Sequence, residues 1–284
     1  MKKTKNKRNN MTFLLFLLPS LLGTTLFTLL PFADSLRRSF FGAVSKEFCG
    51  TSNYRAVFGN EAFRLAVKNT AMFTAVCLPI LIGSSFMVAC LISRLKAVKL
   101  IRSVLLFPMA VPTAALVMVW KLLFDSSGMI NGLLDRFGQG TADFLGSRTA
   151  FSVLVGSYIW KNLGCTVLLW LNGFSAISSS LSEAAQIDGA NRVQTVIYII
   201  LPNLRPTLYT ITVLSFLSSF KVFREAYLVS GAYPHESIYL LQHLFNNWFS
   251  NLELDKMAAA TVPVFAVIFA AVSLLQKAWD KEEA

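Results

Sequence analysis

Charged side chains are scarce in this sequence of 284 residues. Asp, Glu, Lys and Arg together make up 14% of the chain, while hydrophobic residues make up 55%. An ordinary soluble domain carries about 25% charged residues. The deficit indicates that lipid, rather than water, surrounds much of the chain.

Histidine and cysteine are also few, and they lack the spacing of a reactive centre. His235 and His243 stand without an H-E-x-x-H pattern, and the chain has no G-x-x-x-x-G-K-[ST] phosphate-binding loop. We interpret both histidines as ordinary loop or helix-surface residues. The cysteines have no metal-ligand spacing and are interpreted as small apolar packing residues; they are Cys49, Cys77, Cys90 and Cys165. The chain is therefore expected to be no enzyme and to bind no cofactor itself.

The hydrophobic residues are grouped in runs that are long enough to cross a membrane. About 20 apolar residues in a helix span a hydrocarbon core of about 30 Å. Helices are expected because the backbone in lipid must satisfy its own hydrogen bonds. The sequence predicts an all-α, polytopic membrane protein with one six-helix domain over residues 12–278, between a basic segment at 1–11 and a tail at 279–284. The predicted spans are Thr12–Phe32, Thr70–Ile92, Val104–Phe124, Phe151–Phe174, Pro206–Val229 and Met257–Gln276.

The net charge of +11 follows from basic residues that flank these spans. Excess Lys and Arg mark cytoplasmic loops, so both termini are predicted to be cytoplasmic and no nucleic-acid partner is expected. The first run is longer than the apolar region of a signal peptide and has no clear cleavage site, which favours a retained span. The flanking basic residues are Lys2, Lys3, Lys5, Lys7 and Arg8 before the first span, and Arg94, Lys96, Lys99 and Arg102 after the second.

The largest predicted cytoplasmic loop, residues 175–205, begins with a helix signal. Ser180 and Glu183 have the S-x-x-E spacing of a capping box. The residues that follow favour a helix, and Gly189 can end that helix at little cost.

A second short helix is predicted from Arg192 to Ile200. Pro202 is expected to stop it, and Pro206 suits the first turn of the next span. Two short helices joined by a turn are suited to receive force from another protein. An amphipathic surface helix without a partner is the alternative.

The same loop resembles the EAA loop of ABC importer permeases. Its residues fit the family pattern E-A-A-x3-G-x9-I-x-L-P at every specified position. The resemblance implies a type I importer permease fold and coupling helices that dock on a cytoplasmic ATPase. The coupling residues that it implies are Glu183, Ala184, Ala185, Asp188, Gly189, Ile199, Leu201 and Pro202.

Further segments resemble the sugar branch of these permeases, of the maltose and glycerol-phosphate type. They are Asn53-Tyr54, Asn69-Thr70, Trp160-Lys161 with Gly164, and Ser219 to Phe223. The resemblance implies a cell-membrane importer of a carbohydrate-like solute. Its implied partners are a second related permease, two ATP-binding subunits that hold ATP and Mg²⁺, and an extracellular or periplasmic solute-binding protein.

Two helix faces are candidates for the solute path, because their polar side chains recur at helical spacing. Hydroxyls, amides and a tyrosine suit a polyhydroxylated solute, and the resemblance places the path on these spans. The alternative is that the serines only let helices approach closely. The candidates are Tyr158, Lys161, Asn162 and Cys165 on the fourth span, and Ser215, Ser218, Ser219 and Val222 on the fifth.

Charges within the predicted spans raise a second hypothesis for the function. Charged residues in a membrane usually face protein or water. Lys221, Arg224 and Glu225 lie close together in the fifth span, either as a structural cluster or as part of the path. Glu225 is also the one acidic residue away from the span ends, which an ion-coupled secondary transporter would require. That transporter is the alternative to an ATP-driven importer.

Overall fold

The computed structural model describes residues 16–93 and 98–283. Predictions that concern the basic residues before the first span, and those on Arg94 and Lys96, lie outside these ranges. Within them the regular elements are helices, with one isolated bridge between Phe41 and Phe48. The described chain forms two compact units, one with the residues up to Asn60 and Asn247–Phe269, the other with Glu61–Asn246 and the residues from Ala270 onward.

The first unit contains a helix that runs from Phe16 to Arg38. A π-helical turn, η1 (Thr25–Leu29), precedes its last part, α2 (Leu30–Arg38), and α3 (Ser52–Gly59) follows. The ring of Phe32 packs on that of Phe265, with 4.6 Å between the centroids. Phe265 lies on α15 (Leu254–Glu283), so the first and last long helices of the chain meet in this unit.

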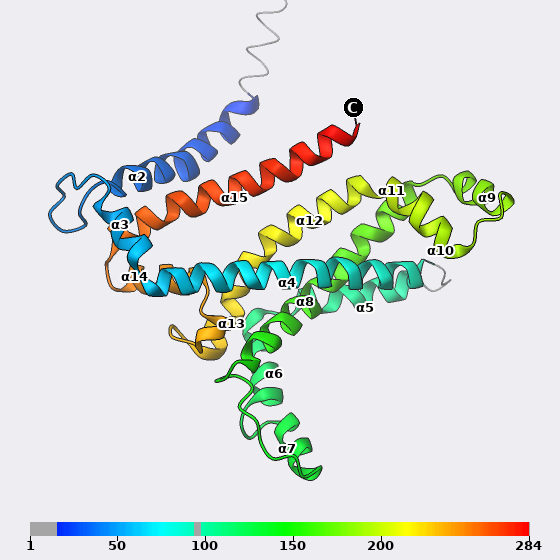
Figure 1. Cartoon of the computed structure of the whole chain (residues 1–284), viewed down its shortest axis with the longest axis horizontal. Helices are drawn as coiled ribbons and strands as arrows, with labels where there is room; N and C mark the ends of the chain where they lie inside the picture. Colours follow the sequence, from blue (N-terminus) through cyan, green and yellow to red (C-terminus); the bar gives the residue numbers. More distant parts are fainter. Residues whose placement is uncertain (1–15, 94–97, 284) are drawn as a thin grey trace, which may run out of the picture. The chain divides into compact units, whose positions relative to one another are not determined.

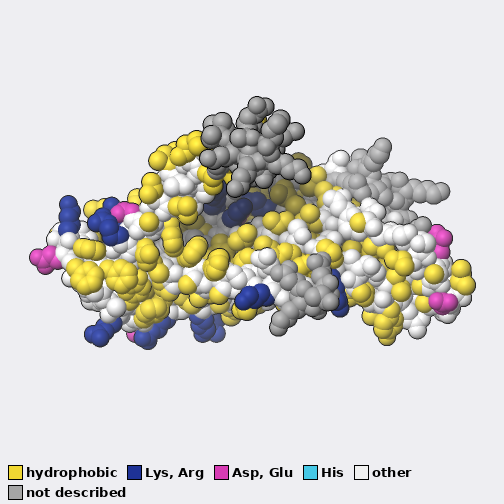
Figure 2. Space-filling model, turned by 90° about the horizontal axis from the view of Figure 1, so that it is seen from above, with side chains coloured by type: hydrophobic (Ala, Val, Ile, Leu, Met, Phe, Trp, Pro, Cys, Tyr) yellow, Lys and Arg dark blue, Asp and Glu magenta, His cyan; other side chains and the backbone are white. Residues whose placement is uncertain are grey.

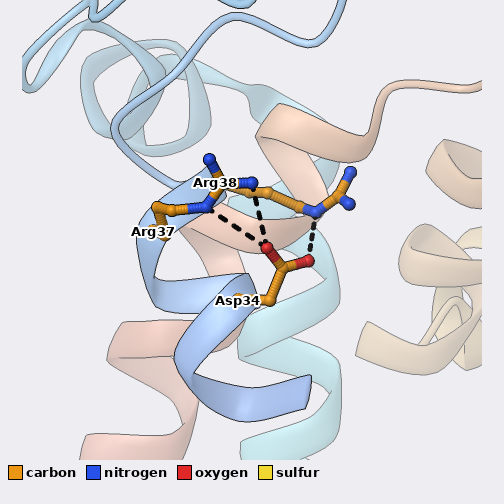
Figure 3. Close-up of polar contacts among 3 residues, drawn as sticks. All are labelled: Asp34, Arg37 and Arg38. Carbon is orange, nitrogen blue, oxygen red and sulfur yellow. Dashed lines mark hydrogen bonds and ion pairs between the residues drawn. The ribbon is translucent and has the colours of Figure 1, made fainter. Parts of the chain in front are cut away.

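The last turn of α2 carries a compact charge cluster (Figure 3). Arg37 Nη2 lies 3.1 Å from Asp34 Oδ1, and Arg38 Nε lies 2.5 Å from Asp34 Oδ2. These are i,i+3 and i,i+4 neighbours on a helix, and the arginines stand where the helix dipole favours positive charge. The arginines also line a cavity of ≈ 290 Å³ together with Lys46 and Asp255. Because these side chains are exposed, the pairs stabilise the fold only modestly.

The second unit is a helical bundle. The long helix α8 packs against α4, α5 and α12, and α13 packs against α6 (Figure 1). The helices are α4 (Glu61–Ile92), α5 (Val98–Ala110), α6 (Thr113–Phe124), α7 (Met129–Arg136), α8 (Thr149–Ala176), α9 (Ser179–Ile187), α10 (Arg192–Gln194), η2 (Thr195–Ile200), α11 (Leu201–Asn203), α12 (Arg205–Ser219), η3 (Phe220–Val222), α13 (Phe223–Ser230), η4 (Glu236–Ile238) and α14 (Leu241–Ser250).

The membrane-spanning architecture predicted from the hydrophobic runs is confirmed. In the described ranges, five helices are long and apolar enough to cross a membrane, and a bent pair raises the number to six. Figure 2 shows hydrophobic side chains over much of one face. Large apolar side chains are exposed on several of these helices, such as Phe27, Met118 and Val267, which suits lipid as the surrounding solvent.

The prediction of one continuous third span, Val104–Phe124, is wrong. The structure places its first residues in α5, which ends at Ala110, and starts α6 at Thr113. Pro112, before α6, has an extended backbone with ψ 140°. A proline disfavours helix for the residue before it, and Pro108 and Pro112 both lack an N–H donor. The candidate span here is Thr113–Arg136.

Two polar side chains near the start of α4 fix a distant loop. Asn69 Nδ2 donates to the carbonyl oxygens of Glu236 (2.5 Å) and Tyr239 (3.1 Å). Thr70 Oγ1 accepts from the backbone N–H of Leu241 at 3.0 Å. Buried polar groups need such partners, so the pair Asn69-Thr70 holds the chain between α13 and α14 against α4.

Candidate coupling loop and solute path

The first helix of the candidate coupling loop, α9, starts earlier than the sequence suggested. Its N-cap is Ser178, whose hydroxyl shares a 2.8 Å hydrogen bond with that of Ser180 and does not cap the backbone. The predicted capping box of Ser180 and Glu183 is therefore wrong. Ser180 already lies within the first turn, so its side chain has no N-cap position to fill.

The end of α9 at Gly189 is confirmed. Ala190 N–H donates to the carbonyl of Ala185 at 2.9 Å, and Gly189 N–H donates to that of Gln186 at 3.1 Å. This pair of bonds is a Schellman motif. It requires the left-handed backbone of Gly189, with φ 81°, a conformation that costs glycine little.

The second helix of the loop runs farther than predicted. Asn191 begins it with a capping box, because its side chain accepts from Gln194 N–H (2.9 Å) while the Gln194 side chain accepts from Asn191 N–H (2.8 Å). The helix continues through η2, a π-helical turn, to Asn203. Pro202 therefore does not stop it. The wider π turn before Pro202 accommodates the missing backbone bond, as helices often do near proline.

A sharp bend joins this loop helix to α12. The segments Arg192–Asn203 and Arg205–Ser230 meet at 70°. Leu204, at the bend, is 1% exposed and packs in a core cluster with Trp170 and Ile211. Gly173 of α8 approaches it so closely that an added Cβ would lie 2.8 Å from Leu204 Cδ2. Pro206 occupies the first turn of α12, as predicted.

The predicted coupling residues differ in their exposure. Ala185 is buried and Ile199 is half-buried. The other coupling candidates are exposed, namely Glu183, Ala184, Asp188, Gly189, Leu201 and Pro202.

Further large apolar side chains of the same loop are also exposed, and the sequence reasoning missed them. The most exposed are Ile187 (85% exposed), Tyr198 (71%) and Val193 (66%). Their signal was the presence of large apolar residues in a segment that is predicted to lie outside the membrane. Exposed apolar groups of this kind mark contact surfaces.

The candidate path residues of α8 take different positions. Tyr158 is buried, and its hydroxyl donates to the carbonyl oxygen of Ser215 at 2.7 Å. Asn162 Nδ2 donates to the carbonyl of Tyr158, within the helix. Lys161, Asn162 and Cys165 are half-buried. In this structure Tyr158 thus belongs to the core, and the other three candidates remain open to the surface.

On the fifth span, most candidate path residues lie between helices. Ser215, Ser219 and Val222 are buried. Ser219 Oγ bonds to the carbonyl of Phe216 at 2.7 Å and lies 3.2 Å from Thr74 Oγ1 on α4. Ser218 is half-buried. The placement of Ser215 and Ser219 fits the packing interpretation, while Ser218 keeps a polar side chain at the surface.

Among the described residues of the fourth and fifth spans, two charged side chains form an ion pair that the sequence did not predict. Lys161 Nζ of α8 makes an ion pair with Glu225 Oε1 of α13, and it lies 3.3 Å from Thr113 Oγ1 of α6. Glu225 is buried, whereas Lys221 and Arg224 are exposed. Glu225 therefore pairs with a lysine from another helix, and the two basic residues near it in sequence point to the surface.

The interpretation of His243 as a surface residue is wrong. Its side chain is 0% exposed and lies between the rings of Phe223 and Tyr239. His243 Nδ1 accepts from the backbone N–H of Leu240 at 3.2 Å. Burial lowers the pKa of His243 to about 4, because the charged imidazolium is poorly solvated there. His235 caps η4 by accepting from Ser237 N–H.

Comparison with known proteins gives the family of this helical bundle. Residues 87–282 match the model of the binding-protein-dependent transport system inner membrane component. This match covers more than half of the chain. The chain belongs to that family, the membrane-embedded permease components of transporters that work with a separate binding protein.

Relatives of known name agree with this assignment over nearly their whole length. The trehalose/maltose transport system permease protein MalF of Thermococcus litoralis is 30% identical over 89% of this chain and 88% of its own. The sn-glycerol-3-phosphate transport system permease protein UgpA of Agrobacterium fabrum is 28% identical over 90% of each chain. The probable ABC transporter permease protein YesP of Bacillus subtilis is 28% identical over 97% of this chain and 92% of its own.

A solved structure shares the fold. A chain in the crystal structure of a bacterial ABC transporter involved in the import of the acidic polysaccharide alginate matches with a TM-score of 0.86. The match covers 99% of both chains at 20% identity. The predicted fold class, an all-α importer permease, is confirmed.

Proposed function

We propose that this chain is the permease subunit of an ATP-driven importer and forms half of the path for a carbohydrate-like solute. Relatives named for trehalose/maltose and for sn-glycerol-3-phosphate support a polyhydroxylated solute. The proposal places the chain in the cytoplasmic membrane with both termini inside. Its partners are a second related permease, two cytoplasmic ATPase subunits that bind ATP and Mg²⁺, and an extracellular or periplasmic solute-binding protein.

The observation that carries the proposal is the exposed turn of the loop that contains the EAA residues. Its two helices end and begin with well-formed caps on either side of Gly189, and Ile187 and Val193 flank this turn with exposed apolar side chains. A capped, ordered turn with apolar groups at its surface is suited to dock in a cleft on another protein. In this proposal Glu183 and Gly189 couple ATPase closure to movement of the membrane helices.

The proposed contacts of the solute are half-buried polar side chains, namely Lys161, Asn162, Cys165 and Ser218. The buried candidates pack behind them and fix the positions of the helices that line the path; they are Tyr158, Ser215, Ser219 and Val222. Neutral hydrogen-bonding groups suit hydroxyl groups of a sugar. The exposed basic residues Lys221 and Arg224 would also favour a solute that carries negative charge.

The coupling role is tested by the same substitution at two glycines that share a left-handed backbone conformation. Gly189 (φ 81°) and Gly140 (φ 71°) both lie in the left-handed region with open space around them. We expect Gly189→Leu to abolish uptake and to reduce recovery of the ATPase subunit when the tagged chain is isolated from its membrane in mild detergent. Gly140→Leu carries the same backbone strain and should retain both. Equal uptake in the two variants would remove the coupling role of Gly189.

The ATP-driven importer is separated from the ion-coupled transporter by the energy source. Uptake should continue when ion gradients are collapsed with ATP maintained, and it should stop when ATP is depleted. Mass spectrometry of the isolated complex should find an ATP-binding subunit and a second six-span protein. A chain that is isolated alone, with uptake that follows the ion gradient, would favour the secondary transporter.

A further inference from the structure

The carboxylate of Glu225 is only half satisfied by the protein. Its Oε1 oxygen pairs with Lys161, but its Oε2 oxygen is buried and has no hydrogen-bond partner among the described residues. Buried polar atoms without a partner are rare and call for an explanation. A bound water molecule or ligand at the site is a common explanation.

Two further buried polar atoms without a partner in the described ranges belong to the same place. They are the indole Nε1 of Trp120 and the hydroxyl oxygen of Ser157. Both side chains, together with Glu225, line one cavity of ≈ 30 Å³. Its other walls are mostly apolar and include Leu154, Ala226 and Ile238, and Ser230 adds one more hydroxyl group.

The helices explain why these groups converge. Thr113 and Trp120 are seven residues apart on α6, and Lys161 and Ser157 are four residues apart on α8, so each pair shares one helix face. Glu225 comes from α13, which packs against α6. At its first oxygen the carboxylate accepts from Lys161, whose ammonium group also donates to the hydroxyl oxygen of Thr113. The other α6–α8 pair borders the cavity at its second oxygen.

The donors and acceptors around the cavity match a single water molecule. An indole N–H only donates, an ionised carboxylate oxygen only accepts, and a hydroxyl does both. A water molecule can accept from Trp120, donate to Glu225 and bond with Ser157, which makes about three hydrogen bonds, the usual number for a buried water. The volume suffices for one or two water molecules, since about 10–15 Å³ open to a water-sized sphere is enough to hold one.

We infer that this cavity is a hydration site with a resident water molecule, held by Trp120, Ser157 and Glu225. The water completes the coordination of the Lys161–Glu225 ion pair and links α6, α8 and α13 through one hydrogen-bonded centre. Trp120 and Ser157 thereby act as positioning residues for the Glu225 carboxylate. This role of the three residues does not depend on which solute the protein transports.

The site is tested by radiolytic labelling of the full chain, purified in detergent with its co-purifying subunits. A short X-ray pulse in water enriched in ¹⁸O produces hydroxyl radicals from bound water, and these label the side chains that touch it. Leu154 and Ile238 are buried but line the cavity, and Leu81 is buried in the core away from it. We expect ¹⁸O labelling of Leu154 and Ile238 and none of Leu81. Equal absence of label at all three would overturn the inference.

A matched pair of serine variants on α8 sharpens the test. Ser157→Ala removes one of the three water partners, so the binding constant of the water should fall about fivefold, the factor that corresponds to a lost hydrogen bond of about 1 kcal/mol, and labelling of Leu154 should decrease. Ser152→Ala changes an exposed serine of the same helix and should leave the labelling unchanged. Unchanged labelling in Ser157→Ala would overturn the assignment. If that variant does not fold, Trp120→Phe takes its place with the same expectation.

Added solutes distinguish a bound water molecule from a hydroxyl group of a transported solute in the cavity. Labelling of Leu154 that persists in saturating maltose or glycerol 3-phosphate supports a resident water. Labelling that disappears with either compound, while exposed side chains react as before, would overturn the inference and make the cavity part of the solute path.

Discussion

The hydroxyl of Tyr158 donates a hydrogen bond of 2.7 Å to the backbone carbonyl oxygen of Ser215, and this bond joins α8 to α12 within the core. The ring of Tyr158 also packs edge-on against Phe73 of α4, with 5.5 Å between the centroids. One side chain therefore ties three helices of the bundle together. Two of the residues that the sequence placed on a solute path meet each other instead.

Removal of that hydroxyl should affect stability rather than solute affinity. Tyr158→Phe keeps the ring contact with Phe73 and loses the bond to Ser215. We expect the variant to be less stable by about 1 kcal/mol, the usual net value of one hydrogen bond, and to keep the KM for uptake. Thermal unfolding in detergent and uptake kinetics measure the two quantities. A raised KM with unchanged stability would show that Tyr158 contacts the solute.

The close approach of α8 to α5 at Gly164 predicts a severe loss of stability when this glycine is replaced. A Cβ on Gly164 would lie 3.3 Å from Leu105 Cα and would overlap the carbonyl group of Leu105 on α5. Because a backbone cannot move aside as a flexible side chain does, Gly164→Ala should separate α5 from α8 and destabilise the protein by about 1–3 kcal/mol.

Gly156 is the control for this prediction, since it lies on the same helix with nothing within 4 Å of an added Cβ. Gly156→Ala should be neutral or slightly stabilising. The midpoints of thermal unfolding of the two variants should therefore differ by several degrees. Equal midpoints would contradict the close approach of α5 and α8.

Two adjacent serines should respond differently to the same substitution. Ser219 is buried against Thr74, whereas Ser218 is half-buried. Ser219→Leu should lower the amount of folded protein in the membrane, because the packed site has no room for leucine. Ser218→Leu should leave that amount unchanged and reduce uptake. Immunoblotting of membranes measures the first quantity, and normal uptake by a well-folded Ser218→Leu variant would remove Ser218 from the path.

The buried imidazole of His243 predicts a loss of stability in acid. Its pKa is lowered to about 4 in the folded protein, against 6.5 for a free histidine, so between these values the unfolded chain binds more protons than the folded one. Stability therefore falls as the pH drops through this window, by on the order of 3 kcal/mol in total. Above a pH of about 6.5 this contribution is constant.

The hydrogen bond that His243 accepts gives a second reason why stability should depend on pH. His243 Nδ1 accepts from Leu240 N–H, so a proton added at Nδ1 would remove that bond and face a donor. His243→Asn should lack this part of the pH dependence, and His235→Asn should retain it. The midpoint of thermal unfolding, measured between pH 4 and 7 for all three proteins, checks the prediction. Parallel curves for the parent protein and His243→Asn would contradict it.

The elements that depend on local chemistry were predictable from the sequence. The long apolar runs gave the membrane helices, since lipid leaves the backbone few alternatives to a helix. The end of α9 was predictable because few residues other than glycine adopt the backbone of Gly189. The EAA pattern pointed to the loop whose turn the structure shows as ordered and exposed.

The contacts between helices were not predictable in the same way. Helical spacing shows which residues share a face, but it does not show which face of another helix they meet. For this reason the pairing of Lys161 with Glu225, which lie 64 residues apart, was missed, and His243 was assigned to the surface. Pro112 falls within the predicted third span because its neighbours are hydrophobic, and hydrophobicity alone does not show the break between α5 and α6.

The bend at Leu204 joins the candidate coupling loop to the membrane helix α12. The loop helix and α12 meet there at 70°, and Leu204 is enclosed by Trp170 and Ile211 in a close-packed core. Such a core has little free space in which one side chain can turn alone. Under the proposed coupling role, a push at the Gly189 turn would pass through Leu204 to α8 and α12 together, because Trp170 of α8 and Ile211 of α12 enclose that side chain.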